Sequence, residues 1–359
     1  MLTWQDRTLR DLLGELGLDE AAEEPFPHDG WSGSTFTRLR AADGSTFVLK
    51  RTSPRLDWIV RATRDDSLRE AWAAETVGWA IVPPGLVALP YHGAAADGDG
   101  AAILMPDLTG ELISWEPAAA AGTIPAADLE RVLDAVARLH ALPWPQRADP
   151  PPRLGPGPWC PLAERLLLTS RRTCLEMLPF GGAGARAAER LLAGWDAFDR
   201  TASVAAHSLV ADLVADPGPL VAALGRLPSV GIHGDLKLAN LALLDGGVGF
   251  IDWQMVSVAP VAVELGWLAV SNSAVLPVGF DALIASYRAA LARQAPDPHL
   301  IVGDWDAQLD LARIVGLLLR GWRKGLDAEA GARLGSGVSG ADDLAEWSTA
   351  TVDAGRRRL

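Results

Sequence analysis

Short alternating segments of hydrophobic and polar residues occupy the N-terminal part of the chain. Over residues 26–50 these segments are separated by Ser32-Gly33 and Asp43-Gly44, a pattern typical of antiparallel hairpins. We therefore expect a small, mainly antiparallel β lobe over residues 1–108. The other elements predicted in this part are two strands and two helices, over residues 87–91, 101–105, 3–18 and 66–80.

From residue 109 onwards, apolar residues recur mostly at the three- and four-residue spacing of helices. This pattern predicts a larger, mainly helical C-terminal lobe over residues 109–359, and with the β lobe it predicts the α+β class. A chain of 359 residues is long enough for such a bilobal protein. The helical segments are residues 127–141, 162–178, 185–205, 206–224, 260–270, 280–293 and 304–324.

One hairpin interrupts the helical part, and polar residues stand at both of its ends. Asp245-Gly246-Gly247 separates two apolar runs, which is typical of a two-residue turn. Centring the turn near Gly246 places Asn240 and Asp252 opposite each other, within one residue of register. Because directly opposed side chains lie about 5 Å apart at Cβ, their oxygen atoms could share a magnesium ion.

The turn before this hairpin supplies a candidate base and a candidate cation. Asp235 can face the same metal and act as the base or positioner for a substrate hydroxyl, an effect worth roughly 10²- to 10⁴-fold in rate. Lys237 could neutralise charge on a transferred phosphoryl group, and His233 is predicted to hold the loop by hydrogen bonding. Each residue alone fits an ordinary hairpin with polar ends, but the combination favours phosphoryl transfer.

The sequence from His233 to Asn240, followed by Asp252, resembles the catalytic segment of the aminoglycoside phosphotransferase and choline kinase group. These enzymes are small-molecule relatives of the protein kinases. The resemblance implies a protein-kinase-like fold with ATP held between its two lobes. It also implies Asp235 as catalytic base and Asn240 and Asp252 as Mg²⁺ ligands.

The same resemblance assigns nucleotide contacts in the N-terminal part. Lys50 matches the strand lysine that holds the α- and β-phosphates, with Glu70 as its expected partner and Glu75 as the alternative. Lys50 and Lys237 are two of only three lysines in the chain, and a compact ammonium group suits a phosphate in a tight cleft. The remaining expected contacts are a phosphate-covering loop and one residue beside the adenine: Gly30, Ser32, Gly33, Ser34 and Val48.

Two features distinguish this chain from the protein kinases. Trp253 and Gln254 replace the phenylalanine and glycine of the Asp-Phe-Gly triplet, which argues against a flipping regulatory switch. Only a short interval separates Asp252 from the helix expected near Pro260, so it has no room for a peptide-binding activation segment. A small acceptor molecule is therefore favoured over a protein substrate.

The net charge of −13 argues against nucleic acid or an anionic membrane as the main partner. It favours a cationic or neutral acceptor, with an amino sugar or aminoglycoside slightly ahead of choline-like alcohols, homoserine and neutral sugars. A nucleotide-binding pseudokinase is the alternative from another class. The candidate acceptor contacts are four acidic residues and four tryptophans: Asp304, Asp306, Asp310, Glu346, Trp267, Trp305, Trp322 and Trp347.

Targeting and membrane signals are weak. Residues 1–10 carry Asp6 and Arg7 where a secretory signal would have an apolar core, which predicts a cytoplasmic protein. The apolar run 248–280 contains Asp252 and Glu264, so we expect it to be a buried soluble core rather than a membrane span.

Overall fold

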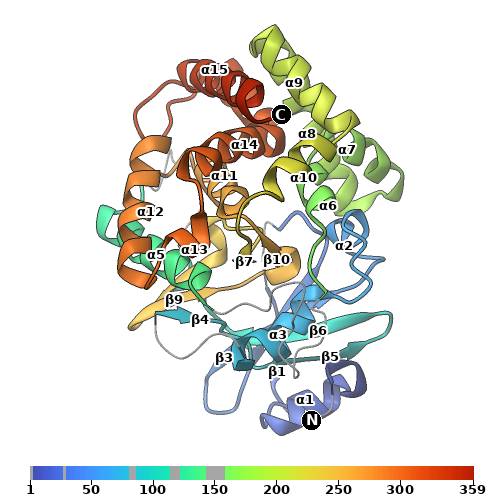
Figure 1. The fold of residues 1–359 in the computed structure, drawn as a ribbon. Helices are drawn as coiled ribbons and strands as arrows, with labels where there is room; N and C mark the ends of the chain where they lie inside the picture. The colour runs from blue at the N-terminus through green and yellow to red at the C-terminus, as the bar shows by residue number, and fades with distance from the viewer. Residues whose placement is uncertain (1–2, 27–29, 81–85, 114–121, 143–157) are drawn as a thin grey trace.

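The computed structural model describes residues 3–26, 30–80, 86–113, 122–142 and 158–359. Figure 1 shows a β-sheet formed by the N-terminal part and a group of helices formed by the C-terminal part. The predicted α+β class, with an antiparallel N-terminal sheet and a mainly helical C-terminal part, is confirmed. The division into lobes at residue 108 stays a prediction.

The N-terminal sheet is antiparallel throughout and has the strand order β1-β2-β3-β6-β5. Its strands are β1 (Ala22–Pro25), β2 (Thr35–Arg40), β3 (Thr46–Thr52), β5 (Gly93–Asp97) and β6 (Gly100–Pro106). The helices of this part are the 3₁₀ helix η1 (Trp4–Asp6), α1 (Leu9–Glu15), α2 (Trp58–Ala62) and α3 (Arg69–Ala80). The helix predicted over residues 3–18 is thus shorter, because Arg7 is extended and Thr8 caps α1. Helix α2 and strand β5 were not predicted.

Alternation along β3 decides which side chains face the rest of the molecule. Val48 packs with residues of α3, whereas Leu49 packs with Leu12 of α1 on the other side of the sheet. Because successive strand residues face opposite sides, Lys50 shares the face of Val48. The same alternation therefore directs Lys50 towards α3, which carries Glu70.

Helix α14 (Trp305–Glu329) lies at the centre of the helical part and packs against α8 (Gly182–Thr201), α11 (Val261–Ser271) and α15 (Gly340–Arg358) (Figure 1). Helix α15 was not predicted. The segment predicted as one helix over residues 162–178 is broken at Ser170, whose side chain caps the second piece. The other elements are α5 (Ala126–His140), α6 (Leu162–Leu167), α7 (Arg171–Met177), η2 (Leu178–Phe180), α9 (Val204–Ala215), α10 (Gly218–Leu224), α12 (Phe280–Gln294) and α13 (His299–Val302).

Short strands between the sheet and the helices carry the predicted catalytic segment (Figure 1). In the hairpin, Leu241 pairs with Phe250, and the Ile251 N–H donates to the Asn240 carbonyl at 3.0 Å. Asn240 and Asp252 therefore stand within one residue of register, as predicted. These elements are β4 (Val87–Ala88), β7 (Val230–Ile232), η3 (Leu238–Asn240), β8 (Leu241–Leu244), β9 (Gly247–Phe250), η4 (Trp253–Met255) and β10 (Ser257–Ala259).

The apolar run 248–280 contributes β9, β10 and α11, and every residue of α11 is buried. In the part of the chain that the structure describes, no helix combines the length and apolarity needed to cross a membrane.

Candidate active site

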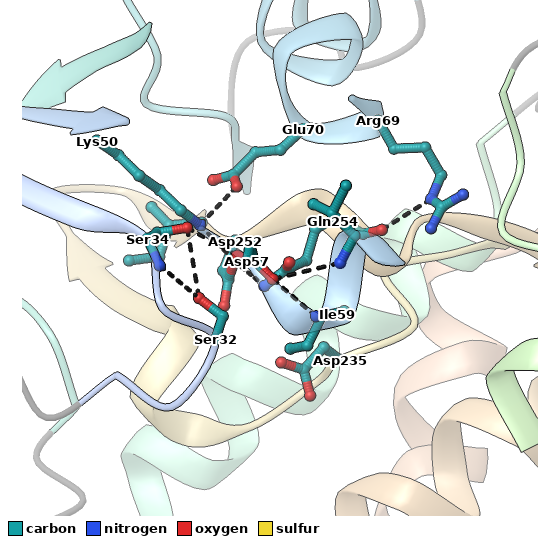
Figure 2. Close-up of polar contacts among 12 residues, drawn as sticks. Ser32, Ser34, Lys50, Asp57, Ile59, Arg69, Glu70, Asp235, Asp252 and Gln254 are labelled. Atoms are coloured by element: carbon teal, nitrogen blue, oxygen red, sulfur yellow. Dashed lines mark hydrogen bonds and ion pairs between the residues drawn. The ribbon is translucent and has the colours of Figure 1, made fainter. Parts of the chain in front are cut away.

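A buried ion pair joins β3 to α3. The Lys50 ammonium lies 2.6 Å from Glu70 Oε2 and 2.8 Å from Asp252 Oδ1, so it links both parts of the molecule (Figure 2). Burial by itself lowers the pKa of Lys50, but the charges of Asp252 and Glu70 outweigh it and raise that pKa above its ordinary value. Lys50 is therefore a fixed cation at the point where the two parts meet.

Tyr91 completes this group, and the sequence did not indicate it. Its hydroxyl donates to Glu70 Oε1 at 3.1 Å and accepts the Asp252 N–H at 2.9 Å. Glu75, the alternative partner for Lys50, instead accepts from Arg7 at 2.9 Å. A tyrosine after a short apolar strand has no motif of its own, so only the folded arrangement shows its contacts.

Asp252 has an unusual backbone conformation, with φ 65° and ψ 56° in the left-handed region. Residues other than glycine seldom occupy this region, and such strained positions concentrate at functional sites. Gln254 Nε2 donates to Asp252 Oδ1 at 2.9 Å. Burial alone would raise the pKa of Asp252, but the charges of Lys50 and Lys237 lower it, which favours the ionised carboxylate.

The catalytic loop, residues 233–240, places Asp235 between Lys237 and Asn240. Lys237 Nζ lies 2.9 Å from Asp235 Oδ2, and Asn240 Nδ2 donates to the same oxygen at 3.2 Å. The Asn240 amide also donates to the Asp235 carbonyl at 2.9 Å, which closes the loop on itself. Asp235 thus has a fixed position with only 6% of its surface exposed.

Glu264 of α11 holds the backbone of this loop directly. Its carboxylate accepts the N–H groups of His233 at 2.7 Å and Gly234 at 2.9 Å. The sequence placed Glu264 only within a buried apolar run, and the structure shows its contact with the loop. His233 accepts the Asp235 N–H on Nδ1 at 3.2 Å, so its Nε2 carries the proton and donates to Ile251 O at 2.8 Å. This arrangement agrees with the predicted structural role of His233.

Gly234 cannot be replaced without moving the loop. Its φ is +81°, and a Cβ atom there would lie 2.0 Å from the Met255 carbonyl oxygen. The Gly234 carbonyl accepts a hydrogen bond from Arg165 Nε at 2.6 Å. The glycine of the sequence motif is therefore required by close backbone packing between the loop and η4.

Oxygen atoms suitable for a magnesium ion face this loop. In the described part of the chain, the Asn240 side chain uses Nδ2 for its hydrogen bonds, and Asp252 uses Oδ1. Asn240 Oδ1 and Asp252 Oδ2 are then the atoms that could bind Mg²⁺, which prefers a few oxygen ligands completed by phosphate and water. The residues present fit the predicted metal.

The predicted phosphate loop, residues 30–35, is tied to the start of α2. Ser34 Oγ donates to Asp57 Oδ2 at 2.8 Å, and the Ser32 carbonyl accepts the Trp58 N–H at 2.9 Å. A Cβ atom at Gly33 would lie 2.2 Å from the carbonyl oxygen of Leu56, just before α2. Asp57 was not predicted, although an aspartate just before a short apolar helix is a capping signal. Figure 2 shows Ser32 and Ser34 of this loop close to Lys50. The predicted adenine contact Val48 is buried in a cluster with residues of α3.

Three of the four acidic residues proposed as acceptor contacts have other partners. Asp304 caps α14, and Asp310 pairs with Arg357 at 2.6 Å. Glu346 lies 3.5 Å from Arg313 on the outer side of the helices. Asp304, Asp310 and Glu346 are therefore engaged in a helix cap or an ion pair.

The model of the phosphotransferase enzyme family matches residues 24–301, a range that includes Lys50, the catalytic loop and Asp252. The chain belongs to this phosphotransferase family. A comparison with curated proteins gives no significant match.

Solved structures similar to this family member cover nearly all of its length. A macrolide 2'-phosphotransferase from Brachybacterium faecium is 18% identical, with 96% of this chain and 97% of that chain covered and a TM-score of 0.41. A choline/ethanolamine kinase family protein from Mesorhizobium loti is 14% identical, with coverage of 94% and 88% and a TM-score of 0.44. An aminoglycoside phosphotransferase from Streptomyces rimosus is 21% identical, with coverage of 88% and 96% and a TM-score of 0.41.

Proposed function

We propose that this protein is a Mg-ATP-dependent kinase that phosphorylates a hydroxyl group of a small molecule. The supporting observation is the meeting of two groups of residues. Lys50, Glu70 and Asp252 form one group (Figure 2), and the catalytic loop with Asp235 and Lys237 forms the other. The charge of Lys237 acts on both Asp235 and Asp252, so the two groups belong to one site.

Each residue then has a role in transfer. Bound Mg-ATP supplies the phosphoryl group, with Asn240 and Asp252 as the residues that hold the metal. Lys50 and the phosphate loop bind the nucleotide phosphates, while Glu70 and Tyr91 hold Lys50 in place. Asp235 orients the acceptor hydroxyl and accepts its proton, and Lys237 offsets negative charge, because catalysis of phosphoryl transfer is mostly positioning and charge stabilisation.

The acceptor is a small molecule in this proposal, and an amino sugar or aminoglycoside stays one candidate among several. That preference depended on the net charge of −13 and on four acidic residues, of which Asp304 caps a helix and Asp310 and Glu346 pair with arginines. Choline-like alcohols, homoserine and neutral sugars remain candidates. A cytoplasmic location also stays a prediction.

The test is magnesium-dependent release of ADP in the presence of a library of hydroxylated compounds. Asp235→Asn should lower the rate by roughly 10²-fold or more, because it removes the proton acceptor. Asp245→Asn is the matched control, since this exposed aspartate lies in the turn between β8 and β9, and it should change the rate by less than about 2-fold. If ATP binds but no compound accelerates ADP release, the protein is a pseudokinase.

A further inference from the structure

Arginine and tryptophan side chains stack against one another beside the catalytic loop. The guanidinium carbons of Arg165 and Arg320 lie 4.4 Å and 5.2 Å from the ring centroid of Trp267. Arg320 also lies 4.7 Å from the ring of Trp322, which is 6.2 Å from the ring of Trp31 in the phosphate loop. We call Arg165, Arg320, Trp267 and Trp322 the arginine cluster.

The arginine cluster borders Asp235. Arg165 on α6 donates through Nε to the Gly234 carbonyl at 2.6 Å, which belongs to the peptide group joined to Asp235. Burial lowers the pKa of Arg165 and Arg320, and the negative charge of Asp235 opposes this change in both. Both guanidinium groups are therefore close enough to the catalytic loop to interact with its carboxylate.

Among the described residues, the buried side-chain atoms of the arginine cluster that lack a hydrogen-bond partner are all donors. Arg165 is 1% exposed and Arg320 is 6% exposed. Within the described residues, no hydrogen-bond acceptor contacts Nη1 or Nη2 of Arg165, Nε of Arg320, or the indole N–H groups of Trp267 and Trp322. A buried cation without a partner costs several kcal/mol, so such a group of donors is suited to bind an anion.

Carboxylates close to the cluster already have other partners. Asp235 contacts Lys237 at 2.9 Å, and Asp327 contacts Arg323 at 2.9 Å. Glu264 accepts two backbone N–H groups of the catalytic loop. Among the residues that the structure describes, neither Arg165 nor Arg320 has an ion-pair partner within 4.0 Å. The positive charge next to Asp235 is therefore in excess, although the whole chain carries a net charge of −13.

We propose that the acceptor carries an anionic group, a carboxylate or a phosphate, which binds to Arg165 and Arg320 while its hydroxyl group lies at Asp235. This inference rests on the proposed kinase function and adds the class of its acceptor. A guanidinium group presents its N–H donors in a plane that matches carboxylate and phosphate oxygens. The indole N–H groups of Trp267 and Trp322 supply further donors, so the site fits an anion better than an ammonium group.

Matched pairs of acceptors test the proposal. D-gluconate is compared with sorbitol, and glycerol 3-phosphate with glycerol, so that one pair tests a carboxylate and the other a phosphate. Choline and kanamycin are the cationic compounds. We expect kcat/KM, measured by ADP release at saturating Mg-ATP, to be at least ~10-fold higher for one anionic compound than for its neutral partner, since a good charge-assisted contact is worth about this factor.

Substitutions of Arg320 then test whether this residue causes the preference for the anionic compound. Arg320→Met should raise the KM of the anionic compound about 10-fold or more, and thereby remove the preference for it over the neutral compound. The matched control is Arg313→Met, because Arg313 lies two turns earlier on α14 and is stacked in the same way, 4.4 Å from Phe280. This control should keep the preference. Arg320→Lys retains the charge and should keep part of the preference, which provides a folded variant if Arg320→Met does not fold.

Two results with the variants would overturn the anionic acceptor. One is that Arg320→Met and Arg165→Met both retain the preference for the anionic partner. The other is that the substitutions raise the dissociation constant for ATP instead of the KM of the anionic compound, because the cluster would then bind the nucleotide phosphates. Turnover of only choline, kanamycin or the neutral partners would support the kinase function and refute the anionic acceptor.

Binding can be measured even if no compound in the set is phosphorylated, an outcome that would count against the kinase function. In that case, D-gluconate and inorganic phosphate should still raise the Tm of the wild type and Arg313→Met more than that of Arg320→Lys. Sorbitol at the same concentration should not separate the variants. Equal Tm shifts in all three proteins would overturn the anion site, because general salt effects on stability act on each of them alike.

Discussion

Glu264→Gln tests whether the catalytic loop is held by a buried carboxylate. Glu264 is fully buried and accepts the N–H groups of His233 and Gly234, at 2.7 Å and 2.9 Å. Its Oε2 also lies 3.4 Å from His140 Nε2. Glutamine has almost the same shape but only one acceptor oxygen, so the substitution changes the chemistry of the contact and leaves its volume nearly unchanged.

The expected loss of stability in Glu264→Gln follows from these contacts. The glutamine oxygen can accept one of the two backbone N–H groups, and the loss of the other hydrogen bond to a charged group costs about 1.5–3 kcal/mol. The glutamine NH₂ group then faces a backbone N–H, which leaves a buried donor without a partner at a cost of about 1–3 kcal/mol. We expect the free energy of unfolding to fall by about 3–5 kcal/mol in total.

Urea denaturation of both proteins measures this difference. The matched control is Glu346→Gln, because the Glu346 side chain is 60% exposed and its pair with Arg313 is 3.5 Å long. Its effect should stay below about 0.5 kcal/mol. A loss below about 1 kcal/mol in Glu264→Gln would contradict the two charged hydrogen bonds.

The difference in stability between wild type and Glu264→Gln should also depend on pH. Burial by itself raises the pKa of Glu264, but the hydrogen bond with His140, the nearby imidazoles of His140 and His233 and the His233 N–H together lower it below the ordinary 4.5. A carboxyl group whose pKa is lower in the folded state stabilises the fold above its unfolded pKa and loses this contribution as pH falls through its folded pKa. The difference between wild type and Glu264→Gln should therefore be largest near neutral pH and narrow below pH 4.5.

Two further substitutions test the loop and the ion pair. Gly234→Ala should cost about 2–4 kcal/mol of stability in urea denaturation and lower kcat at least ~10-fold, because its Cβ would overlap a carbonyl. Gly246→Ala is its control: Gly246 has the same φ of +81° and no atom within 4 Å of the added Cβ, so an equal loss in both variants would mean that strain alone is responsible. Lys50→Met should lower kcat/KM for ATP by about 10²-fold or more, measured by ADP release. Unchanged ATP kinetics would remove Lys50 from the nucleotide site.

Local patterns in the sequence predicted those parts of the fold that depend on neighbouring residues. The register of the β8–β9 hairpin follows from Asp245 and Gly246, because the turn and the pairing are set within a few residues. Long segments with apolar residues at helical spacing likewise predicted α5, α8 and α14. Helix boundaries were less accurate where a capping side chain such as Ser170 divides one apolar pattern into two helices.

Contacts between distant segments could not be predicted in this way. Tyr91 bonds to Asp252 across 161 positions, and Arg165 bonds to Gly234 across 69. Neither Tyr91 nor Arg165 lies in a recognisable motif, and only the packing of the two parts of the molecule brings these pairs together. The net charge of −13 sums the whole surface, so it could not reveal that Arg165 and Arg320 stack on Trp267 beside the catalytic loop.

The contacts of the catalytic loop separate into two kinds with different consequences. Glu264, Arg165 and His233 bind backbone atoms of residues 233–235 and 251, and they attach the loop to α11, α6 and the hairpin. Lys237, by contrast, contacts the Asp235 carboxylate from within the loop, and Asn240 donates both to this carboxylate and to the Asp235 carbonyl. A metal ion or an acceptor hydroxyl would compete only for the Asp235 carboxylate. Ligands can therefore replace the contacts with this carboxylate, while the contacts with the backbone keep the loop in place. Substitutions of the first kind should therefore lower stability and turnover together, whereas changes at Lys237 should act mainly on turnover.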